Sequence, residues 1–229
     1  MDKTNFYAVI VAGGNGNRMQ TATPKQFLLL NGLPIIMHTI LKFSNNKYKP
    51  KIIIVIAQEH LGIWAELIKK YNFKPQFTVV CGGKERFDSV KNSLAIIQEN
   101  AIVAIHDAVR PLLSDNLINN CFQSALNNKN AICAVQAKDS VRLVNGLLNK
   151  TLQRNQIYLV QTPQVFTIEQ LKIAYKTCFT TEFTDDASVV ENAGFEINLI
   201  EGEAQNIKIT HPTDLIFAES IILSEAAKN

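Results

Sequence analysis

Residues 7–19 read Tyr-Ala-Val-Ile-Val-Ala-Gly-Gly-Asn-Gly-Asn-Arg-Met, and this stretch decides the fold. Its first half is an apolar run that does not alternate with polar residues, as is typical of a strand covered on both faces of a parallel sheet. Its second half is rich in glycine and begins where the strand ends. Open α/β sheets bind ligands beyond the carboxyl ends of such strands. The stretch therefore predicts the first strand of an α/β domain, followed by a ligand-binding loop.

The alternation of strand and helix continues to residue 136. Further apolar runs lie at residues 51–57, 77–80, 101–105 and 131–135. Apolar residues with helical spacing lie between them, within 35–43, 61–68, 90–97 and 117–125. This order predicts βαβ units, in which right-handed crossovers place helices on both faces of a mostly parallel sheet. The later pattern predicts helices over 168–178, 185–192 and 212–226, and strands over 196–200 and 206–210.

Residues 137–159 interrupt this pattern with a polar segment. Asn145-Gly146 stands between two apolar pairs, which is a strong signal for a β-hairpin turn. An isolated hairpin is marginally stable in water, so we expect this β-arm to pack on a second subunit of a homodimer. The interpretation divides the chain into a main domain, residues 1–136 and 160–229, and a dimerisation arm, residues 137–159.

Composition excludes several functional classes. Of the 229 residues, 47% are hydrophobic and 19% are charged, which excludes a disordered chain. The net charge of +3 is too small to favour nucleic acid as the main partner. No apolar run or leader pattern points to a membrane or to secretion, so we expect a cytoplasmic protein. The four cysteines lack CxxC or zinc spacing and are interpreted as reduced thiols, with one active cysteine as the alternative.

The glycine loop carries the first chemical motif. Glycines let a backbone approach phosphate and aim its N–H groups at it, and two cations follow, Arg18 and Lys25. The spacing matches neither GxGxxG nor GxxxxGK[ST], which argues against a dinucleotide fold and a P-loop ATPase. The loop thus indicates binding of a phosphorylated ligand, and the alternative is an ordinary turn with solvated basic residues.

Two more motifs follow later strands. Gly82-Gly83 permits close contact with a base or sugar, and Ser89 lies in the first turn of the next helix; the alternative is an ordinary turn with a helix cap. Asp107 ends a strand, where it can hold Mg²⁺ or a ribose hydroxyl, and Arg110 can bind a second anion. The alternative here is an Asp–Arg ion pair. We interpret His106 as a packed histidine rather than a base.

The remaining motifs are weaker individually. The polar residues of the arm can also be simply solvated. Thr184 resembles a helix N-cap. Lys208 lies in a predicted strand, where a lysine would ordinarily face solvent. No protein nucleophile or Ser/His/Asp order is visible. A set of anion-binding cations without a nucleophile favours phosphoryl-type transfer, in which catalysis is mostly positioning and charge stabilisation.

Taken in order, these motifs carry a resemblance that extends from residue 7 to about residue 219. They are A-G-G-N-G-N-R-M…P-K-Q, G-G-K-E-R-F-D-S-V, H-D-A-V-R-P, Q-T-P-Q-V-F, T-D-D-A-S and N-I-K-I-T…P-T-D-L. The chain resembles the 2-C-methyl-D-erythritol 4-phosphate cytidylyltransferases. The ribitol-5-phosphate cytidylyltransferases share most of these motifs and give the alternative acceptor; a non-catalytic nucleotide-binding module is a third, less favoured interpretation.

The resemblance implies a Rossmann-like nucleotide-diphospho-sugar transferase fold with a projecting β-arm that interlocks two subunits. It implies transfer of CMP from CTP to methylerythritol phosphate with release of pyrophosphate and with Mg²⁺, an early step of the non-mevalonate isoprenoid pathway. Departures from the family pattern are small: Gly13 and Val109 stand where alanine is usual, and Ser140 replaces a threonine.

Roles for individual residues follow from the same resemblance. The implied catalytic residues are Arg18, Lys25, Arg154 (from the partner's arm) and Lys208. The implied nucleotide-binding residues are Ala12, Gly13, Gly14, Gly16, Gly83, Ser89 and Asp107. The implied acceptor-binding residues are Asp107, Arg110, Ser140, Arg154, Thr162 and Thr184, and Asp107 is the implied metal ligand.

Overall fold

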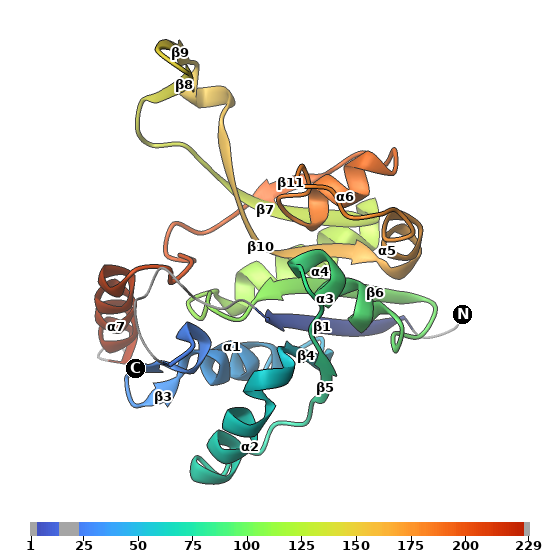
Figure 1. Cartoon of the computed structure of the whole chain (residues 1–229), viewed down its shortest axis with the longest axis vertical. Coiled ribbons are helices and arrows are strands. Elements are labelled where there is room, and N and C mark those ends of the chain that lie inside the picture. Colours follow the sequence, from blue (N-terminus) through green and yellow to red (C-terminus); the bar gives the residue numbers. More distant parts are fainter. Residues whose placement is uncertain (1–3, 14–22, 227–229) are drawn as a thin grey trace.

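A seven-stranded sheet forms the centre of the protein (Figure 1). The structure is a computed structural model that describes residues 4–13 and 23–226. In spatial order the strands are β5 (Thr78–Cys81), β4 (Lys51–Ile56), β1 (Asn5–Ala12), β6 (Ala101–Asp107), β10 (Tyr158–Thr167), β7 (Asn130–Gln136) and β11 (Leu199–Glu201). Every strand of this sheet except β10 runs in the same direction. The predicted, mostly parallel sheet is confirmed.

Helices cover both faces of this sheet, as predicted. One face carries α1 (Ile35–Ser44), α2 (Leu61–Lys70) and α4 (Asp115–Asn128), and the other carries α3 (Arg86–Leu94), α5 (Ile168–Ala174) and α6 (Asp186–Asn192). The side chains of β1 alternate between the two cores: Ala8 and Ile10 pack on the first face, Tyr7 and Val9 on the second. The strand therefore needs apolar residues at every position, which explains its unbroken apolar run.

A third, smaller apolar cluster joins the C-terminal helix to the body. Helix α7 (Pro212–Ala226) packs through Ala218 on Leu30 and Ile209. Leu30 belongs to a small hairpin of β2 (Leu29–Leu30) and β3 (Leu33–Pro34). This cluster fixes the backbone on either side of Lys208 to the main domain.

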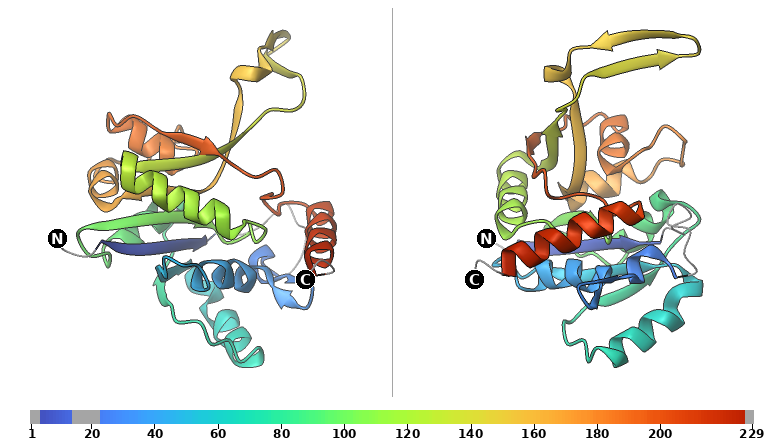
Figure 2. Two further views of the ribbon diagram at one scale, coloured as in Figure 1. Left: turned by 180° about the vertical axis from the view of Figure 1, so that it is seen from behind. Right: turned by 90° about the vertical axis from the view of Figure 1, so that its left-hand side faces the viewer.

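Strands β8 (Val141–Asn145) and β9 (Leu148–Leu152) form a hairpin that projects from the sheet (Figure 2). Its two-residue turn is Gly146-Leu147, one residue later than the predicted centre at Asn145-Gly146. Gly146 has a φ of +58°, which suits glycine at the first central position of a hairpin turn. Leu147 at the tip is fully exposed.

Some predicted elements are wrong in detail. Strand β10 was not predicted, because Pro163 interrupts its apolar run; the register shift between Val160 and Gln164 accommodates the proline. Residues 206–210 form no strand in this part of the described chain, and Ile209 instead makes one backbone bond to Val109. Helix α5 ends at Ala174, earlier than residue 178, and the predicted strand over 196–200 is the shorter β11. No helix in the described part of the chain has the length and apolarity to span a membrane.

Candidate active site

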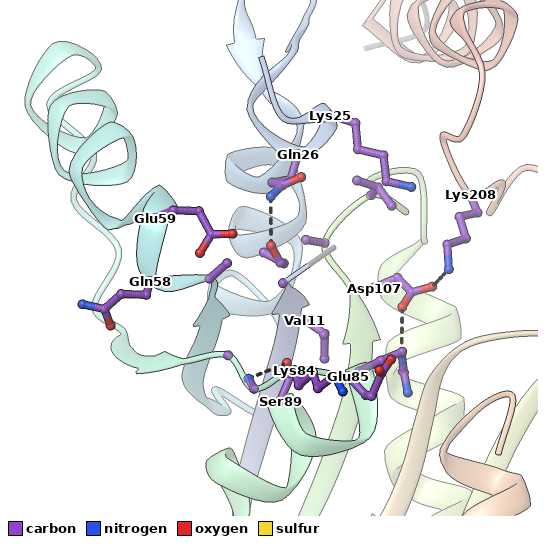
Figure 3. Close-up of a pocket in the computed structure, with 18 residues that line it drawn as sticks. Val11, Lys25, Gln26, Gln58, Glu59, Lys84, Glu85, Ser89, Asp107 and Lys208 are labelled. Atoms are coloured by element: carbon purple, nitrogen blue, oxygen red, sulfur yellow. Dashed lines mark hydrogen bonds and ion pairs between the residues drawn. The ribbon is translucent and has the colours of Figure 1, made fainter. Parts of the chain in front are cut away.

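A cavity of about 500 Å³ opens at the carboxyl ends of the parallel strands (Figure 3). Strands β1, β4 and β6 end at its floor, and the first turn of α3 forms one wall. The side chains and backbone that line it come from Val11, Ala12, Gly13, Lys25, Gln26, Ala57, Gln58, Glu59, Gly82, Gly83, Lys84, Glu85, Arg86, Ser89, Asp107, Ala108, Val109 and Lys208. Motifs that lie far apart in the sequence thus meet at the sheet edge where the sequence predicts a ligand.

Lys25 reaches this cavity because its neighbours are anchored. It begins a single 3-10 turn, Lys25–Phe27. Gln26 is buried and donates from Nε2 to the Ala12 carbonyl at the end of β1, at 2.9 Å. Phe27 is buried against Trp64 of α2. These two contacts hold the half-buried Lys25 on the same side of the cavity as Lys208 (Figure 3).

The glycine pair after β5 lies against Ser89 of α3. The Gly83 N–H donates to Ser89 Oγ at 3.1 Å, and the Gly82 N–H donates to the Ile56 carbonyl at 2.8 Å. Helix α3 begins with a capping box between Glu85 and Asp88, which fixes its first turn. A side chain at Gly83 would put its Cβ 2.2 Å from Asp88 Cβ, so the close approach requires glycine.

Gly83→Ala is expected to lower the thermal stability and raise the KM for the ligand that the cavity binds. The added methyl group must push the glycine turn away from α3, an overpacking cost of about 1–3 kcal/mol. Gly62→Ala is the matched control, because nothing lies within 4 Å of its added Cβ. Thermal melts and steady-state kinetics measure both effects; a Gly83→Ala enzyme that behaves like Gly62→Ala would contradict this role.

Asp107 is the electrostatic centre of the site. Its Oδ2 lies 2.8 Å from Lys208 Nζ and 3.8 Å from Arg110 Nε, and its Oδ1 lies 3.5 Å from Arg86 Nε. Burial alone would raise the pKa of this carboxyl, but Arg86, Lys208 and Arg110 hold it below its ordinary value. Asp107 is therefore ionised at neutral pH and holds Lys208 at the cavity.

These contacts do not fit the magnesium-binding role expected for Asp107. Both of its oxygens face cations, and a Mg²⁺ ion would have to displace them or meet them at close range. Within residues 4–13 and 23–226, no group of three histidine, cysteine or acidic side chains could hold a metal. The carboxylate instead makes the Asp–Arg ion pair that was the alternative, extended by Lys208 and Arg86.

Similarity to known proteins identifies the family of this chain. The model for the family described as 2-C-methyl-D-erythritol 4-phosphate cytidylyltransferase matches residues 6–224 of the chain. The chain belongs to this family. Among curated relatives, the 2-C-methyl-D-erythritol 4-phosphate cytidylyltransferase of Azobacteroides pseudotrichonymphae is 45% identical over 94% of the chain and 98% of its own length. That of Bacteroides fragilis is 43% identical over the same shares, 94% and 98%.

Solved structures give the same family. The 4-diphosphocytidyl-2C-methyl-D-erythritol synthase of Anaerococcus prevotii aligns with a TM-score of 0.81 and 27% identity, covering 96% of this chain and 99% of its own. The Francisella tularensis 2-C-methyl-D-erythritol 4-phosphate cytidylyltransferase aligns at 0.78 and 32%, covering 95% and 99%. The chain is thus a cytidylyltransferase, one of the nucleotidyltransferases, and the Rossmann-like nucleotidyltransferase fold is confirmed.

Below the cavity of this cytidylyltransferase, His106 and Thr162 support Asp107. His106 is fully buried; burial lowers its pKa to about 4, so the ring is neutral. Its Nε2 bonds the Arg110 carbonyl at 3.0 Å, and its Nδ1 accepts from Thr162 Oγ1 at 3.0 Å. The Thr162 hydroxyl also accepts from the Asp107 N–H at 3.1 Å. His106 is the packed histidine that the sequence predicts. Thr162 is placed to hold Asp107, and its acceptor-binding role stays a prediction.

Arg110 and Thr184 lie outside the cavity lining of this cytidylyltransferase chain, and their acceptor-binding roles stay predictions. Arg110 donates from Nη1 to the Asn206 carbonyl at 2.7 Å, which fixes the segment that carries Lys208. Thr184 is exposed beside α6, but it is not the N-cap: Asp185 caps the helix by accepting from the Ser188 N–H at 2.9 Å. Asp185 and Ser188 form a reciprocal capping box, in which the Ser188 hydroxyl in turn accepts from the Asp185 N–H at 3.3 Å.

The remaining predicted residues lie elsewhere. Ser140 and Arg154 are exposed on the arm, outside the cavity of their own chain. Gly14, Gly16 and Arg18 lie outside the described residues, so their predicted roles stay predictions. Sequence reasoning missed Arg86 and Asp186 as site residues: Arg86 Nη2 lies 2.6 Å from Asp186 Oδ2, although both stood within quoted motifs. Gln58 and Glu59, which also line the cavity, belong to a 3-10 turn after β4 and carried no sequence signal.

Proposed function

We propose that this chain transfers CMP from CTP to 2-C-methyl-D-erythritol 4-phosphate, giving 4-diphosphocytidyl-2-C-methyl-D-erythritol and pyrophosphate. This reaction belongs to the non-mevalonate route to isoprenoid precursors. The observation that carries the proposal is the cavity at the strand ends, where Lys25 and Lys208 lie on one side and the Gly82-Gly83 turn on another. Family membership supplies the identity of the nucleotide and of the acceptor.

The chemistry needs charge compensation more than a base. A phosphate oxygen of the acceptor attacks the α-phosphorus of CTP, and the bond from this phosphorus to the bridging oxygen breaks, so that pyrophosphate leaves with the electron pair. The attacking oxygen is already ionised at neutral pH, and the buried, neutral His106 is not required as a base. The barrier is repulsion between anions, which Lys25, Lys208 and Arg18 would offset in a preorganised site.

The nucleotide would lie along the glycine turns. Ala12, Gly13 and Gly83 present backbone to the cavity, and the Ser89 hydroxyl lies behind them. A Cβ at Gly13 would lie 3.2 Å from Ser89 Oγ, so the Gly13 backbone approaches α3 closely. The exposed Lys208 amino group lies 2.8 Å from Asp107 Oδ2, and the carboxylate thereby holds it where it can reach a phosphate. Asp107 and Arg110 mark the side from which the acceptor would enter.

Dimerisation would complete the acceptor site. The arm carries exposed apolar residues at its tip, and Tyr158, Leu159 and Val160 at its base are 48%, 56% and 41% exposed. A groove of about 960 Å³ lies beside them, lined in part by Arg154 and Leu199. Apolar surface of this kind favours a protein partner, and a second copy of the chain would bring Arg154 to the other subunit's cavity.

Arg154→Ala is expected to raise the KM for the acceptor by about 10- to 100-fold, the loss of one hydrogen bond to a charged group, with a much smaller effect on CTP. The guanidinium is exposed and bonds only the Lys138 carbonyl among the hydrogen bonds found in the described residues, at 2.9 Å. Arg142→Ala is the matched control, because Arg142 bonds Asn149 and Thr151 within the hairpin itself. A selective defect in CTP binding would contradict this role.

Mixed dimers test whether Arg154 acts across the interface. Lys25→Ala and Arg154→Ala each damage a different part of the proposed site. In a random mixture half of the dimers are mixed, and one of their two sites is intact, so activity should recover to about a quarter of the wild-type value. No recovery would show that Arg154 acts within its own chain or not at all.

Magnesium dependence and a cytoplasmic location stay predictions. Because Asp107 does not fit as a ligand, a divalent ion would be held mainly by the phosphates of the nucleotide. Ribitol 5-phosphate remains the alternative acceptor, because glycine at position 13 also occurs among those relatives. A pyrophosphate-release assay with CTP and each alcohol phosphate tests the reaction, with UTP and ATP as base controls and an EDTA arm for the metal. Release with ribitol 5-phosphate alone would overturn the proposal.

A further inference from the structure

We propose that Asp186 and Arg86 form a positioning pair, which holds Asp107 and, through it, Lys208 in the geometry that cytidylyl transfer requires. The inference rests on the proposed function and adds to it a residue that never reaches the cavity. Asp186 lies on the far side of Arg86 from the substrates and acts only through its neighbours.

Asp186 is built into the protein as a fully buried carboxylate. It is 0% exposed and is the first residue of α6. Its Oδ1 accepts from the Tyr175 hydroxyl at 2.6 Å and its Oδ2 from Arg86 Nη2 at 2.6 Å. Breaking either contact would leave a buried charge without its partner, which is costly. The carboxylate therefore holds Arg86 firmly.

The helix start that carries Asp186 is itself fixed to the sheet. Gln164 of β10 accepts from the Ala187 N–H at 2.8 Å through Oε1. The same side chain donates from Nε2 to Asp185 Oδ2 at 2.8 Å. The carboxylate of Asp186 therefore has a position set by the central sheet and not by the helix alone.

Arg86 carries this position to the cavity. It is the first residue of α3, its side chain is 31% exposed, and it lines the cavity. One edge of its guanidinium is fixed by Asp186, and its Nε faces Asp107 Oδ1 at 3.5 Å. Because a guanidinium is rigid and planar, fixing one edge fixes the other. Asp107 then has Oδ1 facing Arg86, while its Oδ2 holds Lys208 at 2.8 Å.

Asp186 also restrains the Arg86 guanidinium so that it does not bind the substrates. Asp107 has three cationic neighbours, Arg86, Arg110 and Lys208, and the single charge of Asp107 cannot balance them. Asp186 supplies the second negative charge. Without it, Arg86 would be free to bind substrate phosphate directly, in competition with Lys208, and productive alignment would be lost while binding would remain.

Asp186→Asn is therefore expected to lower kcat by about 10- to 100-fold, as is usual for partners that orient a functional group, with the KM of both substrates changed less than about threefold. Asp115→Asn is the matched control. It makes the same chemical change at the exposed first residue of another helix, α4, outside the cavity lining, so its kcat should stay near the wild-type value. Melting temperatures are recorded so that both enzymes are assayed fully folded.

A double-mutant cycle separates positioning from mere structural support. If Asp186 acts through Arg86, Asp186→Asn should lower kcat no further in an Arg86→Met background. If Asp186→Asn does not fold, Tyr175→Phe keeps the ring packed on Phe87, at 4.7 Å between centroids, and removes only the hydroxyl; it should lower kcat in the same direction by a smaller factor.

Three outcomes decide the question. A kcat loss in Asp186→Asn that is absent in Asp115→Asn and disappears in the Arg86→Met background supports the pair. Wild-type kcat in Asp186→Asn, or a loss that adds fully to that of Arg86→Met, overturns it. If wild type and Asp115→Asn make no product either, the proposed function has failed instead, so the two failures remain distinguishable.

Discussion

Lys25→Ala is expected to lower kcat by about 100- to 1000-fold, the usual cost of losing one preorganised group that stabilises transition-state charge. Lys25 lies in the cavity wall at the start of a turn that Gln26 and Phe27 anchor. Because Gln26 and Phe27 anchor this turn and both remain in the variant, it should melt like the wild type.

The control for Lys25→Ala is Lys69→Ala. Lys69 is an exposed lysine near the end of α2 and lies outside the cavity lining. Steady-state rates with saturating CTP and acceptor, together with melting curves, give the comparison. Near-normal turnover in a folded Lys25→Ala enzyme would remove Lys25 from the mechanism, and a large loss of stability would show that it supports the fold instead.

Lys208→Ala should have an effect of similar size, again about 100- to 1000-fold in kcat. Its amino group lies 2.8 Å from Asp107 Oδ2, and the side chain is 39% exposed, so a phosphate can approach it. The fold should survive, because Arg86 and Arg110 still face Asp107.

Lys208→Arg and Lys172→Ala complete this comparison. The arginine variant keeps the charge and should recover part of the rate, since a planar fork replaces a point charge less than perfectly. Lys172 is exposed on α5, away from the cavity, and its loss should leave kcat unchanged. Equal rates for Lys208→Ala and Lys172→Ala would contradict the role of Lys208.

The architecture was largely predictable from local patterns, because strands buried on both faces and amphipathic helices each leave a clear signal. Strand β10 was not predicted because Pro163 interrupts its apolar run. Its strand character is evident only from its pairing with β6 and β7. The segment with Lys208 alternates like a strand but does not form one. Turn-like backbone bonds hold it instead. Asn206 fixes it further, because its Nδ2 donates to the Thr162 carbonyl at 2.8 Å.

The candidate site was predictable where it depends on strand ends, since parallel strands bring their carboxyl ends to one edge. The contacts between motifs were not. Arg86 and Asp186 are 100 residues apart, and no spacing rule connects such positions. The full set of cations around Asp107 could not be predicted for the same reason: Arg86, Arg110 and Lys208 approach it from three separate segments.

The fate of the α-phosphorus of CTP is the most direct test of the proposed reaction. The purified enzyme is incubated with CTP labelled at that atom and with 2-C-methyl-D-erythritol 4-phosphate, and in parallel with ribitol 5-phosphate. We predict that the label moves into the cytidine diphosphate derivative of methylerythritol, with one pyrophosphate released per product. Transfer of the label to ribitol 5-phosphate alone, or to neither acceptor, would contradict the proposal.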